Sequence, residues 1–139
     1  MGPNPGMWEQ PIVQGRGIVV TGGFFEAHAT QTVRSPKTGR QIKQQYRFES
    51  GEGTPLLLAT VCGQGCFSVV TTRPNPVVAS VHDRMPLTLS LAEARWWLQA
   101  SWPSLVANWQ KLANRERFAL TAAPERLASP EAFGQGTLF

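Results

Sequence analysis

The stretch Thr71-Thr72-Arg73-Pro74-Asn75, which leads on to Val81-His82-Asp83-Arg84-Met85-Pro86-Leu87, is the most informative part of this 139-residue chain. Threonine, valine and methionine at its two ends, with proline and asparagine between them, predict one short strand-loop-strand unit. This unit places hydroxyls, an imidazole and a guanidinium beside a single loop. Such groups suit a polar site for a ligand that carries phosphate.

A second marker lies upstream, in Gly22-Gly23-Phe24-Phe25-Glu26. One carboxylate ends a run of apolar and aromatic residues that otherwise is typical of a buried strand. If Glu26 is half buried, its pKa should rise toward neutrality, which suits a group that donates and then accepts a proton. The alternative is a glutamate that ends the strand and points to water.

Four features follow one another in this chain: Gly-aromatic-aromatic-Glu, Thr-Thr-x-x-Asn, His-x-Arg-Met-Pro and a helix with the paired Trp96 and Trp97. In this order they resemble the SOS-response-associated peptidase (SRAP) family, whose members capture abasic sites in single-stranded DNA. The matching segments are residues 17–26, 43–61 and 67–97. The resemblance implies an α+β fold in which helices flank a mostly antiparallel, barrel-like β-sheet.

The resemblance also implies roles for individual residues. Glu26, His82 and Thr71 would form the catalytic part of a pocket for the abasic sugar, and Arg84 would bind a phosphate. Arg16 and Asn75 are further candidates for DNA contact. Other interpretations stay open: a satisfied core histidine at 82, a turn shaped by Asn75, and a salt bridge from Arg84 to Asp83 or Glu93.

The chain departs from the family at its start, which reads Met1-Gly2-Pro3-Asn4. The family begins Met-Cys-Gly-Arg, and that cysteine closes a ring on the sugar aldehyde through its amine and thiol. The resemblance is therefore to the C-terminal part of a truncated SRAP domain, and we expect binding without covalent capture. A complementing chain or an upstream segment would restore capture, and a Schiff base through a lysine or Gly2 is a third possibility.

Composition predicts a single globular domain over residues 1–139, with an irregular segment at residues 1–15 that is rich in glycine and proline. Hydrophobic residues make up 42% of the chain and charged residues 16%. No apolar run reaches the roughly 18 residues of a membrane span, and no secretory signal is evident, so we expect a cytoplasmic protein. Cys62 and Cys66 are expected to be reduced and structural, and we expect no metal and no cofactor.

The net charge is +4 and the sequence pI is about 9.7. Such an excess of positive charge favours a polyanionic partner, here single-stranded DNA. The alternative is that these charges only keep a loop solvated. The basic residues concentrate in the first third of the chain, at Arg16, Arg34, Lys37, Arg40, Lys43 and Arg47.

Local patterns predict the elements. Strands are expected at residues 17–25, 44–48, 56–61 and 66–72, with a hairpin or loop between 27 and 41 and one more strand after residue 118. Ser90-Leu91-Ala92-Glu93 has the form of a capping box. Helices are expected at residues 91–100 and 104–114, where Trp97 packs in the core unless the tryptophans stack on bases.

The leading hypothesis is an SRAP-like protein that binds single-stranded or abasic-site DNA and keeps the Glu26, His82 and Thr71 pocket. Whether it is an enzyme is left open. The rival is a non-enzymatic accessory or degenerate interaction protein from a mobile element, whose remaining sheet would need a partner or a second copy to cover its apolar face.

Overall fold

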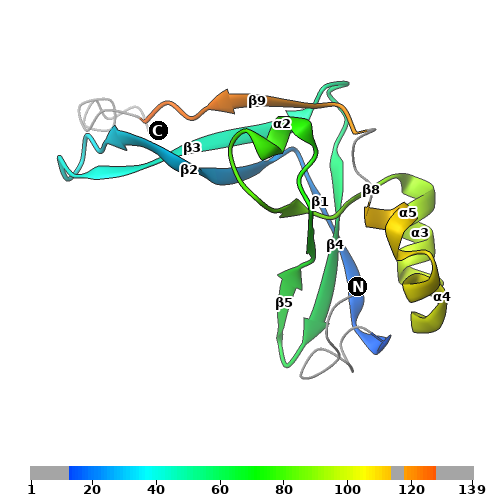
Figure 1. The fold of residues 1–139 in the computed structure, drawn as a ribbon. Helices are drawn as coiled ribbons and strands as arrows, with labels where there is room; N and C mark the ends of the chain where they lie inside the picture. The colour runs from blue at the N-terminus through cyan, green and yellow to red at the C-terminus, as the bar shows by residue number, and fades with distance from the viewer. Residues whose placement is uncertain (1–12, 114–117, 128–139) are drawn as a thin grey trace, which may run out of the picture.

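A computed structural model of the protein describes residues 13–113 and 118–127. The molecule has two arms that run in different directions and meet at a corner (Figure 1). We call one the helix-covered arm, in which strands β1, β4, β5 and β8 carry helices α3, α4 and α5. The other is the ribbon arm, formed by β2, β3 and β9.

The elements have the following bounds. The strands are β1 (Arg16–Thr21), β2 (Phe24–Arg34), β3 (Gln41–Ser50), β4 (Leu56–Gly63), β5 (Cys66–Val69), β6 (Thr71–Thr72), β7 (Met85–Pro86), β8 (Thr88–Leu89) and β9 (Leu120–Pro124). The helices are α2 (Pro76–Ala79), α3 (Leu91–Gln99), α4 (Trp102–Ala107) and α5 (Trp109–Ala113).

The paired strands form an α+β fold with antiparallel pairing throughout the described residues, as expected. The expected barrel is not closed. The strands instead form three separate sheets, in the orders β1-β4-β5 with β8 on β4, β2-β3-β9, and β6-β7. The reason is that the chain changes direction between sheets at the corner, so β2 and β3 pair with β9 rather than completing a ring with β4 and β5.

The change of direction occurs at Gly22 and Gly23, where the predicted strand 17–25 divides into β1 and β2. A side chain at position 23 would not fit, because a Cβ atom there would lie 2.5 Å from the carbonyl oxygen of Phe48. The glycine therefore allows the chain that enters β2 to pass close to the backbone of β3 at Phe48. This divides one predicted strand between two sheets.

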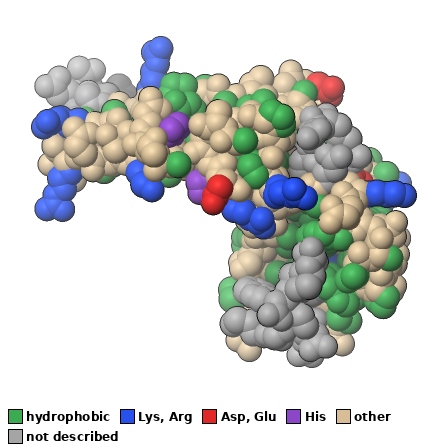
Figure 2. Space-filling view, viewed as in Figure 1, with side chains coloured by type: hydrophobic (Ala, Val, Ile, Leu, Met, Phe, Trp, Pro, Cys, Tyr) green, Lys and Arg blue, Asp and Glu red, His purple; other side chains and the backbone are tan. Residues whose placement is uncertain are grey.

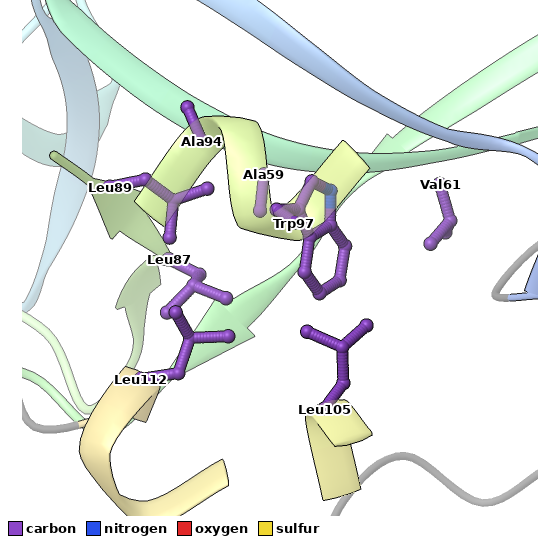
Figure 3. Close-up of a cluster of buried hydrophobic side chains, with 8 residues drawn as sticks. All are labelled: Ala59, Val61, Leu87, Leu89, Ala94, Trp97, Leu105 and Leu112. Carbon is purple, nitrogen blue, oxygen red and sulfur yellow. The ribbon is translucent and has the colours of Figure 1, made fainter. Parts of the chain in front are cut away.

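Strand β4 passes between two hydrophobic clusters, and its side chains alternate between them. Ala59 and Val61 belong to the cluster under the helices, shown in Figure 3. Leu56 and Leu58 belong to a corner cluster that also contains Phe24 and Phe48, whose rings stack at 5.1 Å. The corner cluster thus joins the roots of both arms.

Helix α3 begins with the predicted capping box, in which Ser90 and Glu93 bond each other's backbone N–H groups. Trp97 is 1% exposed and lies over Leu105 in the cluster of Figure 3. Its indole N–H donates to the carbonyl of Gly17 at 3.1 Å, which supports packing rather than base stacking. The predicted helix 104–114 is replaced by α4 and α5, which are separated at Asn108.

The ribbon arm contains the predicted hairpin, with its turn at residues 35–40. The strand expected after residue 118 is β9, which pairs with β3. The irregular segment expected at residues 1–15 lies mostly outside the described residues. None of the helices in the described residues is long and apolar enough to cross a membrane.

Candidate functional site

The two motifs around residues 71–75 and 81–87 fold into one small unit against the start of β2. Asn75 caps α2, and β6 pairs with β7 through Thr71 opposite Pro86. The unit is fastened to β2 by a backbone hydrogen bond of 2.9 Å from the amide of Ala29 to the carbonyl of Val81. His82 is the residue after Val81, so this hydrogen bond fixes its backbone position relative to β2.

Glu26 and His82 lie side by side although 55 residues separate them in the sequence. The carboxyl Oε2 of Glu26 is 3.7 Å from Nδ1 of His82. Both side chains are partly exposed, 24% for Glu26 and 34% for His82, so a ligand can reach them. Glu26 shares a face of β2 with buried Phe24, two residues earlier, which places the carboxyl at the margin of the corner cluster.

Thr71 and Arg84 form the other half of the site. The guanidinium donates from Nε to the Thr71 hydroxyl at 3.3 Å, and from Nη2 to that hydroxyl at 3.1 Å and to the Thr71 carbonyl at 2.9 Å. Thr71 is exposed and Thr72 is buried, as expected for neighbours on a strand. The backbone amide of Arg84 donates to Nδ1 of His82 at 3.2 Å, which links the two halves.

Glu26, Thr71, His82 and Arg84 are therefore one connected group, which we call the polar cluster. They come from β2, β6 and the loop that precedes β7. Figure 2 shows acidic, basic and histidine side chains near one another at the inner side of the corner. The convergence that the sequence motifs predicted for these four residues is present in the structure, while their chemical roles stay predictions.

Burial raises the pKa of the Glu26 carboxyl above its usual range. The nearby His82 acts in the opposite direction and Asp83 adds to the increase, but burial is the larger cause. A carboxyl with a raised pKa exchanges its proton nearer to neutral pH than an ordinary glutamate does. The site therefore contains one group suited to acid and base work beside a cation that suits an anionic ligand.

Asn75 occupies a different position from the one expected of a DNA contact. It is 2% exposed. Its side-chain oxygen accepts from the amide of Val78 at 3.0 Å, and its Nδ2 donates to the carbonyl of Phe118 at 3.1 Å. The alternative interpretation, that Asn75 shapes the turn, matches these contacts, and we do not include Asn75 in a DNA-binding surface.

Arg16 also lies apart from the polar cluster. Its guanidinium donates to the carbonyl of Ala100 and lies 5.7 Å from the centre of the Trp97 ring. Burial lowers the pKa of this guanidinium. These contacts place Arg16 against the end of α3 in the helix-covered arm, and they do not connect it with Glu26 or His82.

Asp83 is a member of the site that sequence reasoning missed. Its carboxyl Oδ1 is 3.5 Å from Nδ1 of His82, and the side chain is 91% exposed. The sequence offers a salt bridge from Arg84 to Asp83 or Glu93 only as an alternative to phosphate binding. The adjacency of Asp83 to His82 in the chain was the only available signal, and it does not specify on which side the carboxylate lies.

His28 was assigned no role from sequence, yet it organises the root of the ribbon arm. Its Nδ1 accepts hydrogen bonds from the amides of Thr30 and Gln31 at 3.1 and 2.9 Å. These bonds occupy the irregular part of β2, where the pairing with β3 shifts between Ala27 and Thr32. The Tyr46 hydroxyl donates to Gln31 at 2.6 Å across the same bulge.

Within the described parts of the chain, no group of three or more histidine, cysteine or acidic side chains is arranged to hold a metal ion. Cys62 and Cys66 are free thiols at the far end of the β4–β5 hairpin. Neither contacts the polar cluster. The chemistry that the arrangement supports is proton exchange by Glu26 and anion binding by Arg84.

Two crystal structures share the fold. A protein from Bacteroides thetaiotaomicron has a TM-score of 0.65 at 20% identity, covering 87% of this chain and 53% of that one. A protein from Bordetella bronchiseptica has a TM-score of 0.62 at 16% identity, covering 88% of this chain and 62% of that one.

The chain thus spans between half and two thirds of the length of these two proteins. Among curated proteins, none matches it. A family model described as SOS response associated peptidase (SRAP) matches residues 4–130, nearly the whole chain. The chain therefore belongs to the SRAP family.

Proposed function

We propose that this chain binds single-stranded DNA and receives an abasic sugar at the polar cluster, without a covalent bond. The observation that carries the proposal is that three separate chain segments meet at this site. Glu26 Oε2 lies 3.7 Å from His82 Nδ1, which accepts from the amide of Arg84 at 3.2 Å. The guanidinium of Arg84 in turn donates to the carbonyl of Thr71 at 2.9 Å. A nucleotide that lacks its base offers both partners that such a site needs. It has a sugar hemiacetal for acid and base chemistry and a flanking phosphate for the cation.

Glu26 would assist the opening of the sugar ring. In this step the carboxylate takes the proton of the anomeric hydroxyl, the bond from the anomeric carbon to the ring oxygen breaks, and the carboxylic acid returns the proton to the ring oxygen. The products are an open-chain aldehyde and the original carboxylate, so no proton is gained or lost. A raised pKa makes the carboxylate a stronger base for the first half of this transfer, and a pKa nearer to the working pH allows the same group to return the proton in the second half.

Arg84 would bind a phosphate next to that sugar. A guanidinium has five N–H donors, and the bonds to Thr71 use its Nε and one terminal nitrogen. Among the described residues the other terminal nitrogen, Nη1, has no partner, and the side chain is exposed. Thr71 thus holds the guanidinium in one orientation while Nη1 remains available for a phosphate oxygen.

The absence of covalent capture is proposed from the composition of the site. The described residues place no cysteine beside Glu26, because Cys62 and Cys66 lie at the β4–β5 hairpin. We therefore expect this chain to bind the open-chain aldehyde reversibly, with affinity from phosphate and sugar contacts.

A binding and trapping experiment tests the proposal. The purified chain is titrated into a fluorescent 15-nucleotide single strand with one abasic site, with and without borohydride, and the samples are also run on a denaturing gel. We expect salt-sensitive binding, weakened in R84Q and unchanged in the matched control R95Q, with no adduct. An adduct without borohydride would show that the chain itself supplies a nucleophile, and no binding at any salt concentration would contradict the proposal.

One observation favours a second function, self-association through an apolar surface. A hollow of about 680 Å³ is lined mainly by apolar side chains, among them Leu57, Leu89, Leu91 and Leu120. Leu91 is 64% exposed there, and Val20 at the same hollow is 66% exposed. If the DNA experiment fails, the oligomeric state of the chain at micromolar concentration, compared with that of L91E, tests this alternative.

A further inference from the structure

The carboxylate of Glu26 is not committed to a structural hydrogen bond. Its Oε2 lies 3.7 Å from Nδ1 of His82, which is longer than a hydrogen bond, and no other donor contacts it among the residues that the structure describes. The side chain is 24% exposed. This carboxylate is therefore free to accept a proton from a ligand at the polar cluster.

His82 offers the complementary group. Its Nδ1 accepts from the backbone amide of Arg84 at 3.2 Å and lies 3.1 Å from the Arg84 carbonyl, so the backbone of Arg84 occupies this side of the ring. In a neutral imidazole one nitrogen accepts while the other carries the proton. Because Nδ1 accepts from the amide, we assign the proton to Nε2, which has no partner within residues 13–113 and 118–127. Nε2 can therefore donate to an oxygen of a ligand.

A carboxylate and a neutral imidazole form the pair that enzymes use to enolise a carbonyl compound. The carboxylate takes a proton from the carbon beside the carbonyl, and the imidazole donates to the carbonyl oxygen. Burial raises the pKa of Glu26, which makes it a stronger base than an ordinary glutamate. An open-chain abasic sugar suits this pair, because its C2′ lies next to the aldehyde and its C3′ carries a phosphate that can leave.

We infer that the polar cluster has a further activity, the cleavage of DNA on the 3′ side of an abasic site by β-elimination. No bond forms between the protein and the sugar. The inference rests on the proposed function, because the open-chain aldehyde must first lie at the polar cluster. It goes beyond that function, since the proposed ring opening is reversible and leaves the strand uncut.

The elimination has two steps. The carboxylate of Glu26 removes a proton from C2′, the electron pair of the broken C–H bond forms a double bond between C1′ and C2′, and Nε2–H of His82 stabilises the enolate oxygen. The carbonyl then reforms, a double bond forms between C2′ and C3′, and the bond from C3′ to the phosphate oxygen breaks with its electron pair on that oxygen. The products are an unsaturated aldehyde on one fragment and a 5′-phosphate on the other, and Glu26 releases its proton to solvent.

Arg84 is the group that would stabilise the leaving phosphate. A phosphodiester carries one negative charge and a phosphate monoester approaches two, so negative charge on the phosphate increases as the bond breaks. Hydrogen bonds of 2.9 to 3.3 Å to Thr71 hold the guanidinium. The same residue thus positions the imidazole of His82 through its backbone amide and offers a cation to the phosphate through its side chain.

The test follows cleavage of a 5′-labelled single strand with one abasic site on a denaturing gel at neutral pH. The purified chain should accelerate cleavage by roughly 100-fold over the strand alone, the low end of what a positioned base contributes. Mass spectrometry should identify the unsaturated aldehyde on the labelled fragment. Reduction of the aldehyde with borohydride before the protein is added should abolish cleavage, and borohydride added together with the protein should trap no adduct.

Variants separate the base from the donor. E26Q removes the base and keeps the shape of the side chain, so its cleavage rate should fall to that of the strand alone. The matched control E49Q changes a glutamate of the ribbon arm that is 47% exposed, and it should cleave as wild type does. H82Q keeps an N–H donor while H82L has none, so H82Q should retain more activity. Each variant is also titrated with a strand that contains a tetrahydrofuran residue, which cannot open to an aldehyde, to show that it still folds and binds.

Deuterium at C2′ of the abasic sugar should slow cleavage by the wild type, because proton removal at C2′ then breaks a stronger bond. Equal rates for the two strands would limit Glu26 to ring opening and overturn the inference. Full activity in E26Q would overturn it as well, and so would an adduct trapped by borohydride during cleavage, because it would show an imine. A wild-type chain that binds the tetrahydrofuran strand without accelerating cleavage would overturn the inference alone, whereas failure of the proposed function shows as absence of binding to that strand.

Discussion

The two arms differ in how many of their side chains are buried. In the helix-covered arm eight buried side chains pack between β4, β8 and the three helices. In the ribbon arm, burial is confined mainly to the root, and most of the remaining side chains are polar or basic. The buried packing among the described residues therefore lies in one arm and the corner.

The corner between the arms combines buried hydrophobic packing with polar side chains that reach the solvent. Its hydrophobic cluster fixes the backbone of the α2 unit through Val78, Val81 and Met85, which are at most 3% exposed. The polar cluster lies directly at the margin of that packing. The four side chains of the polar cluster thus extend from a well-packed backbone to a surface that a ligand can reach.

The largest effect should come from the helix-covered arm. W97A removes a fully buried indole and leaves the carbonyl of Gly17 without its donor. We expect the free energy of unfolding to fall by about 3–5 kcal/mol, as measured by urea denaturation. L98A, at a neighbouring position that is 49% exposed, should change it by less than about 0.5 kcal/mol. Similar values for the two variants would contradict the assignment of stability to this arm.

The corner should be next in sensitivity. N75A removes the cap of α2 and the bond to the carbonyl of Phe118, both in a buried position. We expect a loss of about 2–3 kcal/mol. N75D keeps the acceptor for Val78 but not the donor, so its stability in the same denaturation experiment should fall between N75A and wild type. If N75A were as stable as wild type, the α2 unit would not depend on its cap.

Local sequence signals predicted most of the elements because these elements depend on short-range chemistry. The capping box at Ser90 and Glu93, the hairpin around residue 37 and the strand after residue 118 all formed where expected. The break at Gly22 and Gly23 was missed, since it depends on the approach of Phe48 from β3. The open sheet was missed for the same reason, because strand partners are set by contacts distant in sequence.

The prediction of the site depends on the order of motifs along the chain and not on local structural rules. No local rule connects Glu26 with His82, and their proximity was inferred from the order of motifs shared with a family. The structure brings these four residues together, and their roles stay predictions. The order of motifs did not reveal that Asn75 is buried or that Arg16 lies on Trp97, because burial depends on packing that a single motif does not contain.

A smaller effect is expected for variants of the polar cluster, which lies at the surface. T71V removes the hydroxyl that accepts two bonds from Arg84 but keeps the shape of the side chain. The guanidinium should then sample more orientations, and affinity for abasic single-stranded DNA should fall about fivefold, or roughly 1 kcal/mol. Fluorescence anisotropy measures this change. T121V, at an exposed position of β9, is the matched control and should bind as wild type does.

R84K separates charge from geometry at the same position. Lysine keeps the positive charge but not the planar fork, so it cannot contact Thr71 and a phosphate together. We expect R84K to bind the abasic strand as weakly as T71V or more so, with the salt dependence retained. Wild-type affinity in R84K would mean that only the charge matters at position 84 and not the planar fork.

The smallest effect concerns the charge of Glu26. Burial raises its pKa, so the folded state binds more protons than the unfolded state between the ordinary pKa of glutamate and the raised one. The free energy of unfolding must therefore fall as the pH rises through that interval and stay level above it. E26Q has no carboxyl to titrate, so its stability should lose this part of the decline.

Urea denaturation from pH 4 to pH 8 measures the difference between wild type and E26Q. E49Q is the control, since Glu49 lies at the surface of the ribbon arm beside Arg47 and its side chain is 47% exposed. A wild-type curve that rises across the interval would mean that attraction to His82 outweighs burial, which would give Glu26 a lowered pKa. Glu26 would then be held as a carboxylate, which is unsuited to return a proton in the proposed ring opening.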